Sequence, residues 1–211
     1  MKPEIINLDD EIFKFVNIIA MNDAVMRLAF IGNKKRLKED KVLERLKAKM
    51  EVFFEKVLND GYTSQDEYDK DFLNKTWDIC NVCNKEQSGK FTFGNAQKLI
   101  NMMLKYFYIS SYKDGRSKEK FRFCHCPMDQ RLLEDVWSKR ANLDDNIKLG
   151  KRDFFLKSWG KEDFEKEKGN KIKNYPARYD KFQRAVRFLA KEMEINPLEY
   201  DYYIYNRGHQ A

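Results

Sequence analysis

Two lysines stand seven residues apart in one of the least polar segments of the chain. Between residues 97 and 109 the only charged side chains are Lys98 and Lys105. Seven steps bring a helix round to within about 20° of the same direction, so a helix here places both lysines on one stripe. Apolar surroundings and a second ammonium group both lower the pKa of a lysine, and a neutral amine is the nucleophile that imine chemistry requires. In the alternative interpretation, both alkyl stems lie along apolar surface and the ammonium groups reach water or an acid.

A carboxylate follows a short cysteine-rich segment. Asp129 comes directly after Cys124-His125-Cys126-Pro127-Met128 and before a helical pattern that runs through Trp137. Pro127 is predicted in the first turn of this helix, which places Asp129 near the helix N-terminus, where the helix dipole favours an acid. A carboxylate in such a place can stabilise developing positive charge or relay a proton. A purely structural role at the start of the helix is the alternative.

The composition limits the classes of protein that need to be considered. The chain has 211 residues, with 41 Lys and Arg against 34 Asp and Glu, a net charge of +7 and 42% hydrophobic residues. No apolar run reaches the roughly 18 residues needed to cross a bilayer, and the N-terminus does not resemble a signal peptide. We therefore expect a cytoplasmic protein that does not bind membranes, and the positive charge is compatible with a nucleic-acid partner.

Helical periodicity dominates the sequence and predicts an all-α fold. In residues 1–87, an N-terminal helical region, three patterns are apparent, over residues 8–31, 34–58 and 64–87. Ser64 and Glu67 have the spacing of a capping box at the start of the third. Apolar residues at intervals of three and four are expected inside; these include Ile12, Phe15, Val16, Leu43, Leu46, Met50 and Phe53.

Residues 88–211 are predicted to form a second, catalytic region that packs with the first into one unit. Its helix over residues 95–112 is apolar on nearly every side and should sit at the centre of the fold. Further helices are expected through Trp137, over residues 176–194, and after Asn196, Pro197 and Glu199. Residues 88–94 and the basic stretch 113–122 are expected to be loops. Residues 142–174 are predicted to be an insertion, anchored by Phe154, Phe155, Leu156 and Trp159, with a solvated, partly mobile charge run over residues 161–173.

Three separated segments resemble one known family. They are Gly94 to Lys98 with Lys105 and Tyr106; Pro127 to Asp129; and Arg178-Tyr179, continued by Asn196 to Asp201, Tyr205 and Gly208. In this order, over roughly the C-terminal 120 residues, they resemble the archaeal 8-oxoguanine DNA glycosylases, a branch of the helix-hairpin-helix DNA glycosylases. The separation of Lys98 and Asp129 is close to that of the family's catalytic pair. Tyr205 stands where the family has a tryptophan, and the glycine-rich hairpin of other superfamily members is absent.

The resemblance implies a fold of two helical subdomains with a cleft between them, and a role for each matching residue. Lys98 would be the catalytic amine and Asp129 the catalytic carboxylate of a base-excision repair glycosylase with AP lyase activity, acting on an oxidised purine such as 8-oxoguanine. Lys105, Asp201 and Tyr205 would help line the pocket for the extruded base, and Trp77 is a further aromatic side chain that could stack on it. The partner would be double-stranded DNA with a damaged base, bound by a monomer without a cofactor.

Two basic stretches are candidates for contacts with DNA phosphates. The loop over residues 88–94 would offer backbone N–H groups at Gly94 and the charge of Lys90. The stretch 113–122 would add salt-sensitive, sequence-independent affinity. Its candidate phosphate-binding residues are Lys113, Arg116 and Lys118, continued by Lys120 and Arg122. A merely solvated loop is the alternative.

The four cysteines allow a different interpretation. Cys80 and Cys83, together with Cys124 and Cys126, have spacings that can hold one tetrahedral zinc ion. The first pair lies within a helical pattern and has no turn residues of a zinc knuckle, so buried free thiols are the alternative. Two other functions therefore remain open: a non-catalytic helix-hairpin-helix protein that binds nucleic acid, and a zinc-stabilised helical interaction protein.

Overall fold

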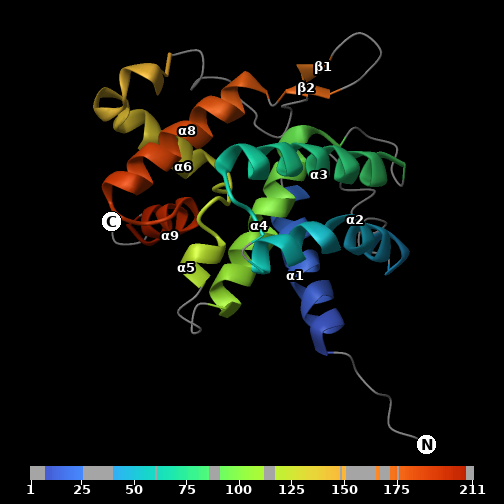
Figure 1. Cartoon of the computed structure of the whole chain (residues 1–211). Coiled ribbons are helices and arrows are strands. Elements are labelled where there is room, and N and C mark those ends of the chain that lie inside the picture. The colour runs from blue at the N-terminus through green and yellow to red at the C-terminus, as the bar shows by residue number, and fades with distance from the viewer. Residues whose placement is uncertain are drawn as a thin grey trace, which may run out of the picture.

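The computed structural model describes residues 8–25, 40–59, 61–85, 91–111, 117–147, 149–150, 165–166, 172–174 and 176–207 (Figure 1). Helices dominate these residues, which confirms the predicted all-α class. The α-helices are α1 (Leu8–Val25), α2 (Asp40–Leu58), α3 (Gln65–Lys85), α4 (Phe93–Ser111), α5 (Ser117–Lys120), α6 (Gln130–Ser138), α8 (Ala177–Glu192) and α9 (Pro197–Arg207). Two short 3-10 helices, η3 (Arg140–Asn142) and η4 (Asp145–Ile147), follow α6.

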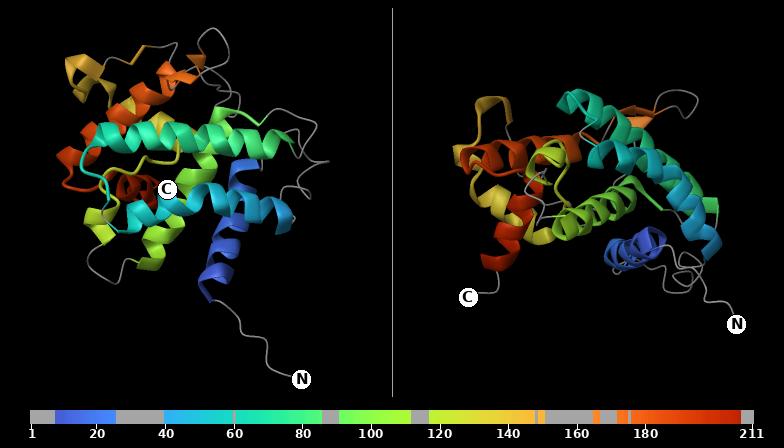
Figure 2. Two further views of the ribbon diagram at one scale, coloured as in Figure 1. Left: turned by 45° about the vertical axis from the view of Figure 1, so that its right-hand side comes forward. Right: turned by 60° about the horizontal axis from the view of Figure 1, so that its bottom comes forward.

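Helix α4 lies in the middle of the molecule, as the sequence predicts. Helices α1, α2 and α3 lie on one side of it and α6, α8 and α9 on the other (Figure 2). A helix that is apolar around most of its circumference must be covered on several sides. The buried side chains of α4 include Leu99, Ile100, Met103, Leu104 and Tyr108.

The buried apolar side chains of residues 1–87 and 88–211 belong to one continuous core. Helix α1 packs along α4 and buries Val16, Ala20 and Ala24. The prediction that Ile12 and Phe15 also lie inside is wrong, because these side chains are 40% and 65% exposed. The buried face of α1 also carries Met21, and Phe15 lies outside this face. In α2 the predicted inner residues, from Leu43 to Val57, are buried.

Capping boxes begin two of the helices where the sequence predicts them. At the start of α3, Ser64 Oγ accepts a hydrogen bond from the N–H of Glu67 at 3.2 Å, and Glu67 Oε2 accepts one from the N–H of Thr63 at 3.0 Å. At the start of α9, Asn196 Oδ1 accepts from the N–H of Glu199 at 3.1 Å, and Glu199 Oε2 accepts from the N–H of Asn196 at 2.9 Å. Both predictions are confirmed because they depend only on residues within one helical turn.

Three predicted loop regions need correction. Helix α4 begins at Phe93, so Gly94 belongs to the helix and is buried. The stretch 113–122 contains helix α5, and Phe121 within it is fully buried. Within the predicted insertion, β1 (Glu165–Lys166) and β2 (Ile172–Asn174) pair as a short antiparallel ribbon. The predicted anchors of that insertion, Phe154 to Trp159, lie outside the described residues.

Candidate active site

Helix α4 carries both predicted lysines, and both are partly buried. The Lys105 side chain is 14% exposed, and its ammonium group forms an ion pair with the carboxylate of Asp201 on α9, which is 7% exposed. The alternative expectation, that an ammonium group reaches an acid, is therefore met at Lys105. The partner comes from a helix that lies 96 residues later in the chain.

The electrostatic surroundings of Asp201 connect the other predicted site residues. Burial raises the pKa of Asp201; the positive charges of Lys105 and Lys98 oppose this rise, and the negative charge of Asp129 adds to it. Lys105 contacts Asp201 directly, and Lys98 and Asp129 lie near enough to act on the charge of Asp201. Packing of the three segments brings together four residues that the sequence selects separately.

Asp129 is the N-cap of α6. Its backbone is extended, with φ −127° and ψ 177°, and its Oδ1 accepts a hydrogen bond from the N–H of Leu132 at 2.9 Å. Pro127 lies two residues before this cap and not in the first helical turn, because α6 begins only at Gln130. The cap satisfies one of the backbone donors at the helix start and fixes the orientation of the carboxylate.

Aromatic side chains of α9 surround the Lys105 ammonium group. The ring of Tyr202 lies 4.8 Å from Lys105 Nζ, and its hydroxyl donates to the Lys105 carbonyl at 2.8 Å. Tyr205, one turn after Asp201, is 51% exposed. Its ring centre lies 5.6 Å from Lys105 Nζ and 5.5 Å from the Arg131 guanidinium carbon. These distances suit cation–π attraction, and one face of α9 therefore presents a carboxylate and an exposed ring next to a lysine.

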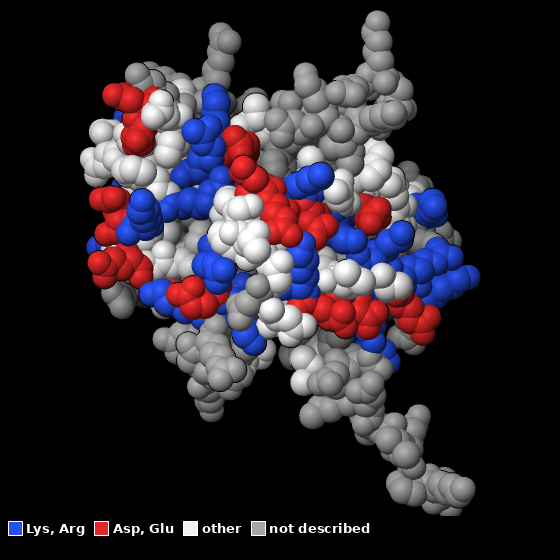
Figure 3. Space-filling view, in the orientation of Figure 1, with Lys and Arg blue, Asp and Glu red and all other residues white. Residues whose placement is uncertain are grey.

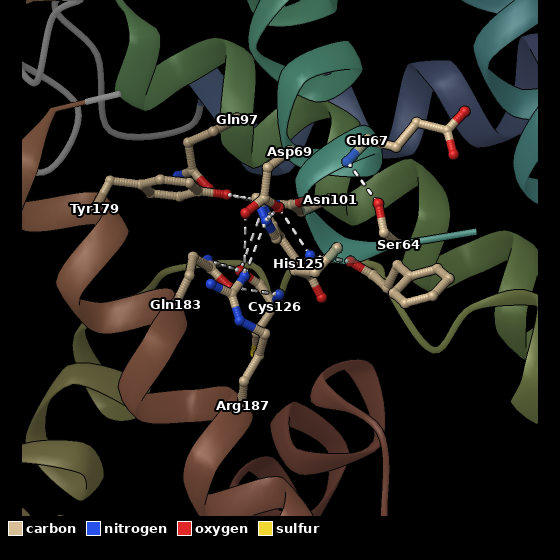
Figure 4. A network of polar contacts seen from close by, with 12 residues as sticks. Ser64, Glu67, Asp69, Gln97, Asn101, His125, Cys126, Tyr179, Gln183 and Arg187 are labelled. Carbon is tan, nitrogen blue, oxygen red and sulfur yellow. Dashed lines mark hydrogen bonds and ion pairs between the residues drawn. The ribbon is translucent and has the colours of Figure 1, made fainter. Parts of the chain in front are cut away.

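A second polar cluster lies on the other side of residues 124–129 and is centred on His125 (Figure 4). His125 is 1% exposed, and its Nε2 lies 2.7 Å from Asp69 Oδ1 on α3. Its Nδ1 lies 2.9 Å from the hydroxyl of Tyr179 on α8, and that hydroxyl accepts from Asn101 Nδ2 of α4 at 3.2 Å. We call these four residues the His125 network; it joins three helices and the segment before α6.

The protonation states of this network follow from burial. Burial lowers the pKa of His125 despite the hydrogen bond to Asp69, so the imidazole is neutral. Burial raises the pKa of Tyr179, so its hydroxyl keeps the proton and donates it to Nδ1. Burial also acts to raise the pKa of Asp69, but the hydrogen bond from His125 and the charge of Arg187 lower it overall. Nε2–H therefore donates to an ionised carboxylate.

Gln183 fixes the backbone that connects the two clusters. Its Oε1 accepts from the N–H of Cys126 at 3.1 Å, and its Nε2 donates to the carbonyl of Cys126 at 2.8 Å. Asn101 Nδ2 lies 3.4 Å from the same carbonyl. Because Asn101 is three residues after Lys98 and Cys126 is three before Asp129, these contacts set how the two predicted catalytic residues are held relative to each other.

Asp69, Asn101, Gln183 and Arg187 were not predicted from the sequence. A signal was nevertheless present in α8, because Tyr179, Gln183 and Arg187 follow one another at intervals of four and so share one face of the helix. Figure 4 shows all three side chains pointing towards residues 125 and 126. A polar stripe on the inner face of an otherwise amphipathic helix predicts buried hydrogen-bond partners.

The cysteines occupy buried positions and are free thiols. Burial raises the pKa of Cys83, Cys124 and Cys126, so these groups are protonated. Within the described residues, no three or more His, Cys, Asp and Glu side chains form a group that could hold a metal ion. The geometry therefore contradicts the zinc alternative for Cys80, Cys83, Cys124 and Cys126.

The predicted phosphate-binding residues are only partly described. Lys90, Lys113 and Arg116 lie outside the described residues. Gly94 is buried within α4, so it cannot offer the exposed loop backbone that the prediction requires. Lys118 is exposed on α5, and its ammonium group donates to the carbonyl of Glu194 at 2.8 Å. Trp77 packs against the core, which agrees with a structural role for that side chain.

The comparisons with known proteins add no family to this picture. No protein-family description, curated protein or solved structure matches the chain. In the described part of the chain, no helix has both the length and the apolar character needed to cross a membrane. What the protein does must therefore be argued from its site.

Proposed function

We propose that this protein is a DNA base-excision glycosylase with AP lyase activity that uses Lys98 and Asp129. The observation that carries the proposal is the grouping of Lys98, Lys105, Asp129 and Asp201, which come from three segments spread over more than 100 residues. Partly buried charges are costly unless they are paired, and such groups concentrate at functional sites. The order of the motifs, which resembles that of the 8-oxoguanine glycosylases, supports the same conclusion.

The proposed chemistry follows from an amine and a carboxylate that face a deoxyribose. The target nucleotide is flipped out of the duplex, and damage or mispairing lowers the free energy needed for this step. The Lys98 amine attacks C1′ of the sugar, the bond from C1′ to the base breaks, and the base leaves with a proton. The C1′–O4′ bond of the sugar then opens, with O4′ taking a proton, and this gives an imine between Lys98 and C1′. Loss of a C2′ proton from the imine expels the 3′ phosphate, which nicks the strand. Asp129 stabilises the positive charge on the sugar and relays the proton from the amine.

The Lys105–Asp201 pair and Tyr205 suit the recognition of the extruded base. The ammonium group supplies N–H donors and the carboxylate supplies acceptors, the two kinds of group that read the edge of a base. Tyr205 offers a half-exposed ring beside them, and stacking of a base on an aromatic ring contributes about 1–3 kcal/mol. The particular damaged base, with 8-oxoguanine as the first candidate, is part of the proposal.

Borohydride trapping tests this proposal. The protein is incubated with duplexes that each contain one lesion, 8-oxoguanine among them, and borohydride is added to reduce any imine to a stable amine. We expect a covalent protein–DNA adduct and a nicked strand with at least one lesion. Lys98→Gln should abolish the adduct, and Asp129→Asn should slow its formation. Lys49→Gln is the matched control because Lys49 is an exposed lysine of α2.

Other results of the trapping experiment would contradict the glycosylase proposal or favour another function. A wild type that traps no more adduct than Lys98→Gln across the lesions would rule out imine chemistry at this residue. Salt-sensitive binding of the same duplexes without any nicking would favour the second candidate, a non-catalytic nucleic-acid-binding protein. The basic depression described next is the observation that favours this second candidate.

A further inference from the structure

A surface depression of about 340 Å³ lies away from the candidate active site, where α5 meets the turn between α8 and α9. Neither the two lysines of the active site nor Asp129 or Asp201 lines it. Four cations line the depression, namely Lys118, Arg122, Arg187 and Lys191, together with the carboxylates of Glu119 and Glu194. Cations therefore outnumber carboxylates by two. Glu119 Oε2 lies 3.4 Å from Arg122 Nη1, and this pair leaves three cations beside the carboxylate of Glu194.

One of these cations is held in place from inside the protein. Arg187 Nη1 lies 3.7 Å from Asp69 Oδ2, so the guanidinium group forms an ion pair with the carboxylate of the His125 network. A guanidinium group presents five donors in a rigid fork, and a fork that is already oriented loses little entropy when it binds an oxyanion. Arg187 thus brings an ordered donor group to the depression, whereas Lys118, Arg122 and Lys191 are exposed.

The turn that forms the wall of the depression has an unusual backbone. Glu194 has a positive φ of 56°, and the N–H of Ile195 donates to the carbonyl of Ala190 at 3.0 Å, as in a Schellman motif. A glycine is the usual residue at this position, because a side chain there is strained. Lys118 donates to the Glu194 carbonyl, which attaches α5 to this turn. The cations of α5 and α8 are in this way held around one depression.

The wider charge distribution continues this basic region. Figure 3 shows Lys and Arg side chains gathered over the part of the surface where α6 and α8 lie, with a group of Asp and Glu side chains beside them over α3. On α8, Arg184, Arg187 and Lys191 follow one another at intervals of three and four, so they lie along one stripe. Such a stripe can follow a charged backbone beyond a single anion.

We infer that this depression binds phosphate groups, and that its ligand is the phosphodiester backbone of DNA. A mixed set of ordered arginine and exposed lysine donors suits the tetrahedral oxyanion of a phosphate. The choice of DNA over a small free phosphate rests on the proposed function. The depression would add non-specific affinity at a distance from the extruded base.

The test compares two double variants that carry the same change in charge. Lys118→Gln/Lys191→Gln alters the depression, whereas Lys41→Gln/Lys49→Gln alters exposed lysines of α2. Binding of a labelled, undamaged duplex is measured by fluorescence anisotropy at several salt concentrations. We expect the depression variant to bind about tenfold more weakly, with a slope of log affinity against log salt that is less steep by about 2. The α2 variant should bind like the wild type, and circular dichroism checks that both variants are folded.

Titration with inorganic phosphate by calorimetry is the second arm. If duplex binding is unchanged but the depression variant alone loses phosphate binding, the site stands and its ligand is a free phosphate. If the two double variants behave alike towards both ligands, or the wild type binds neither, the inference is overturned. Because the duplex is undamaged, these outcomes do not depend on the chemistry of Lys98.

Discussion

Two polar clusters meet at residues 124–129, and they differ in how their groups are paired. In the His125 network, the neutral imidazole is hydrogen-bonded to the Tyr179 hydroxyl and to the Asp69 carboxylate. Of the side-chain polar atoms in this network, only Asn101 Oδ1 is buried without a hydrogen-bond partner. In the other cluster, the Lys105–Asp201 ion pair is also mostly buried, and burial raises the pKa of Asp201 while the charges of Lys105 and Lys98 oppose this rise.

The difference separates a scaffold from a candidate reaction centre. A buried network whose groups are mostly satisfied rigidifies the segments that it joins. A partly buried charge cluster adds little to stability, since desolvation offsets most of the attraction. The segment from Cys124 to Asp129 belongs to both clusters, so the network holds the carboxylate that the proposed chemistry needs.

The largest expected effect on stability comes from breaking the Lys105–Asp201 pair. Asp201→Ala leaves a mostly buried ammonium group without its partner and should lower the free energy of unfolding by about 3–5 kcal/mol. Lys105→Met/Asp201→Leu removes both charges and should cost less than Asp201→Ala alone. Urea denaturation measures all three proteins. If the double variant is less stable than Asp201→Ala, the pair is a net stabilising contact and the contrast with the His125 network disappears.

Removing one hydroxyl from the His125 network should have the next largest effect. Tyr179→Phe leaves His125 Nδ1 without its donor and should cost about 1–3 kcal/mol of unfolding free energy. Tyr203→Phe, which removes a hydroxyl from a partly exposed ring of α9, is the control and should change stability little. The same denaturation experiment applies, and equal losses in the two variants would mean that the network does not stabilise the core.

The neutral state of His125 predicts how stability depends on pH. Its pKa is lowered in the folded protein, so below about pH 6.5 the unfolded chain takes up a proton that the folded chain resists. Stability should be complete above that pH and should fall as the pH drops towards the folded pKa, by at most about 1.4 kcal/mol per pH unit. His125→Gln should flatten this dependence. The raised pKa of Asp201 makes stability rise as the pH falls, which is the opposite dependence. This contribution is the same in the wild type and in His125→Gln, so it cancels when the two proteins are compared.

The smallest effect separates the two roles of Asp129. Asp129→Asn keeps a capping side chain and should leave stability within a few tenths of a kcal/mol of the wild type, while Asp129→Ala should cost about 1 kcal/mol. If the proposed function holds, both variants slow strand nicking, because both lack the carboxylate. Nicking by Asp129→Asn at the rate of the wild type would leave this residue with a structural role only.

Several features of the site could be predicted from the sequence because they depend on near neighbours. The stripe shared by Lys98 and Lys105 and the position of Asp129 at a helix start follow from spacing within one or two turns. The ion pair of Lys105 with Asp201 could not be derived from spacing, and the resemblance only placed both residues near one pocket. The connection of His125 to Asp69 and Tyr179 was not predicted, since each partner lies more than 50 residues away.

Errors in the fold prediction have the same origin. Phe15 has the periodicity of an inner residue, yet it is exposed, because the face of α1 that is buried carries Val16, Ala20 and Met21 instead. The charge run after residue 160 gave no sign of the β1–β2 ribbon, which depends on pairing between two short segments.

The amino-acid sequence alone determined the helices, the central place of α4, and which lysines and which acid stand at positions suited to chemistry. These properties depend on hydrogen bonds and apolar contacts within a few residues. Only the tertiary structure decided which of the charged groups meet, which stay neutral, and that one segment serves both clusters. Such outcomes depend on desolvation and on contacts between distant segments, and both arise only when the helices pack.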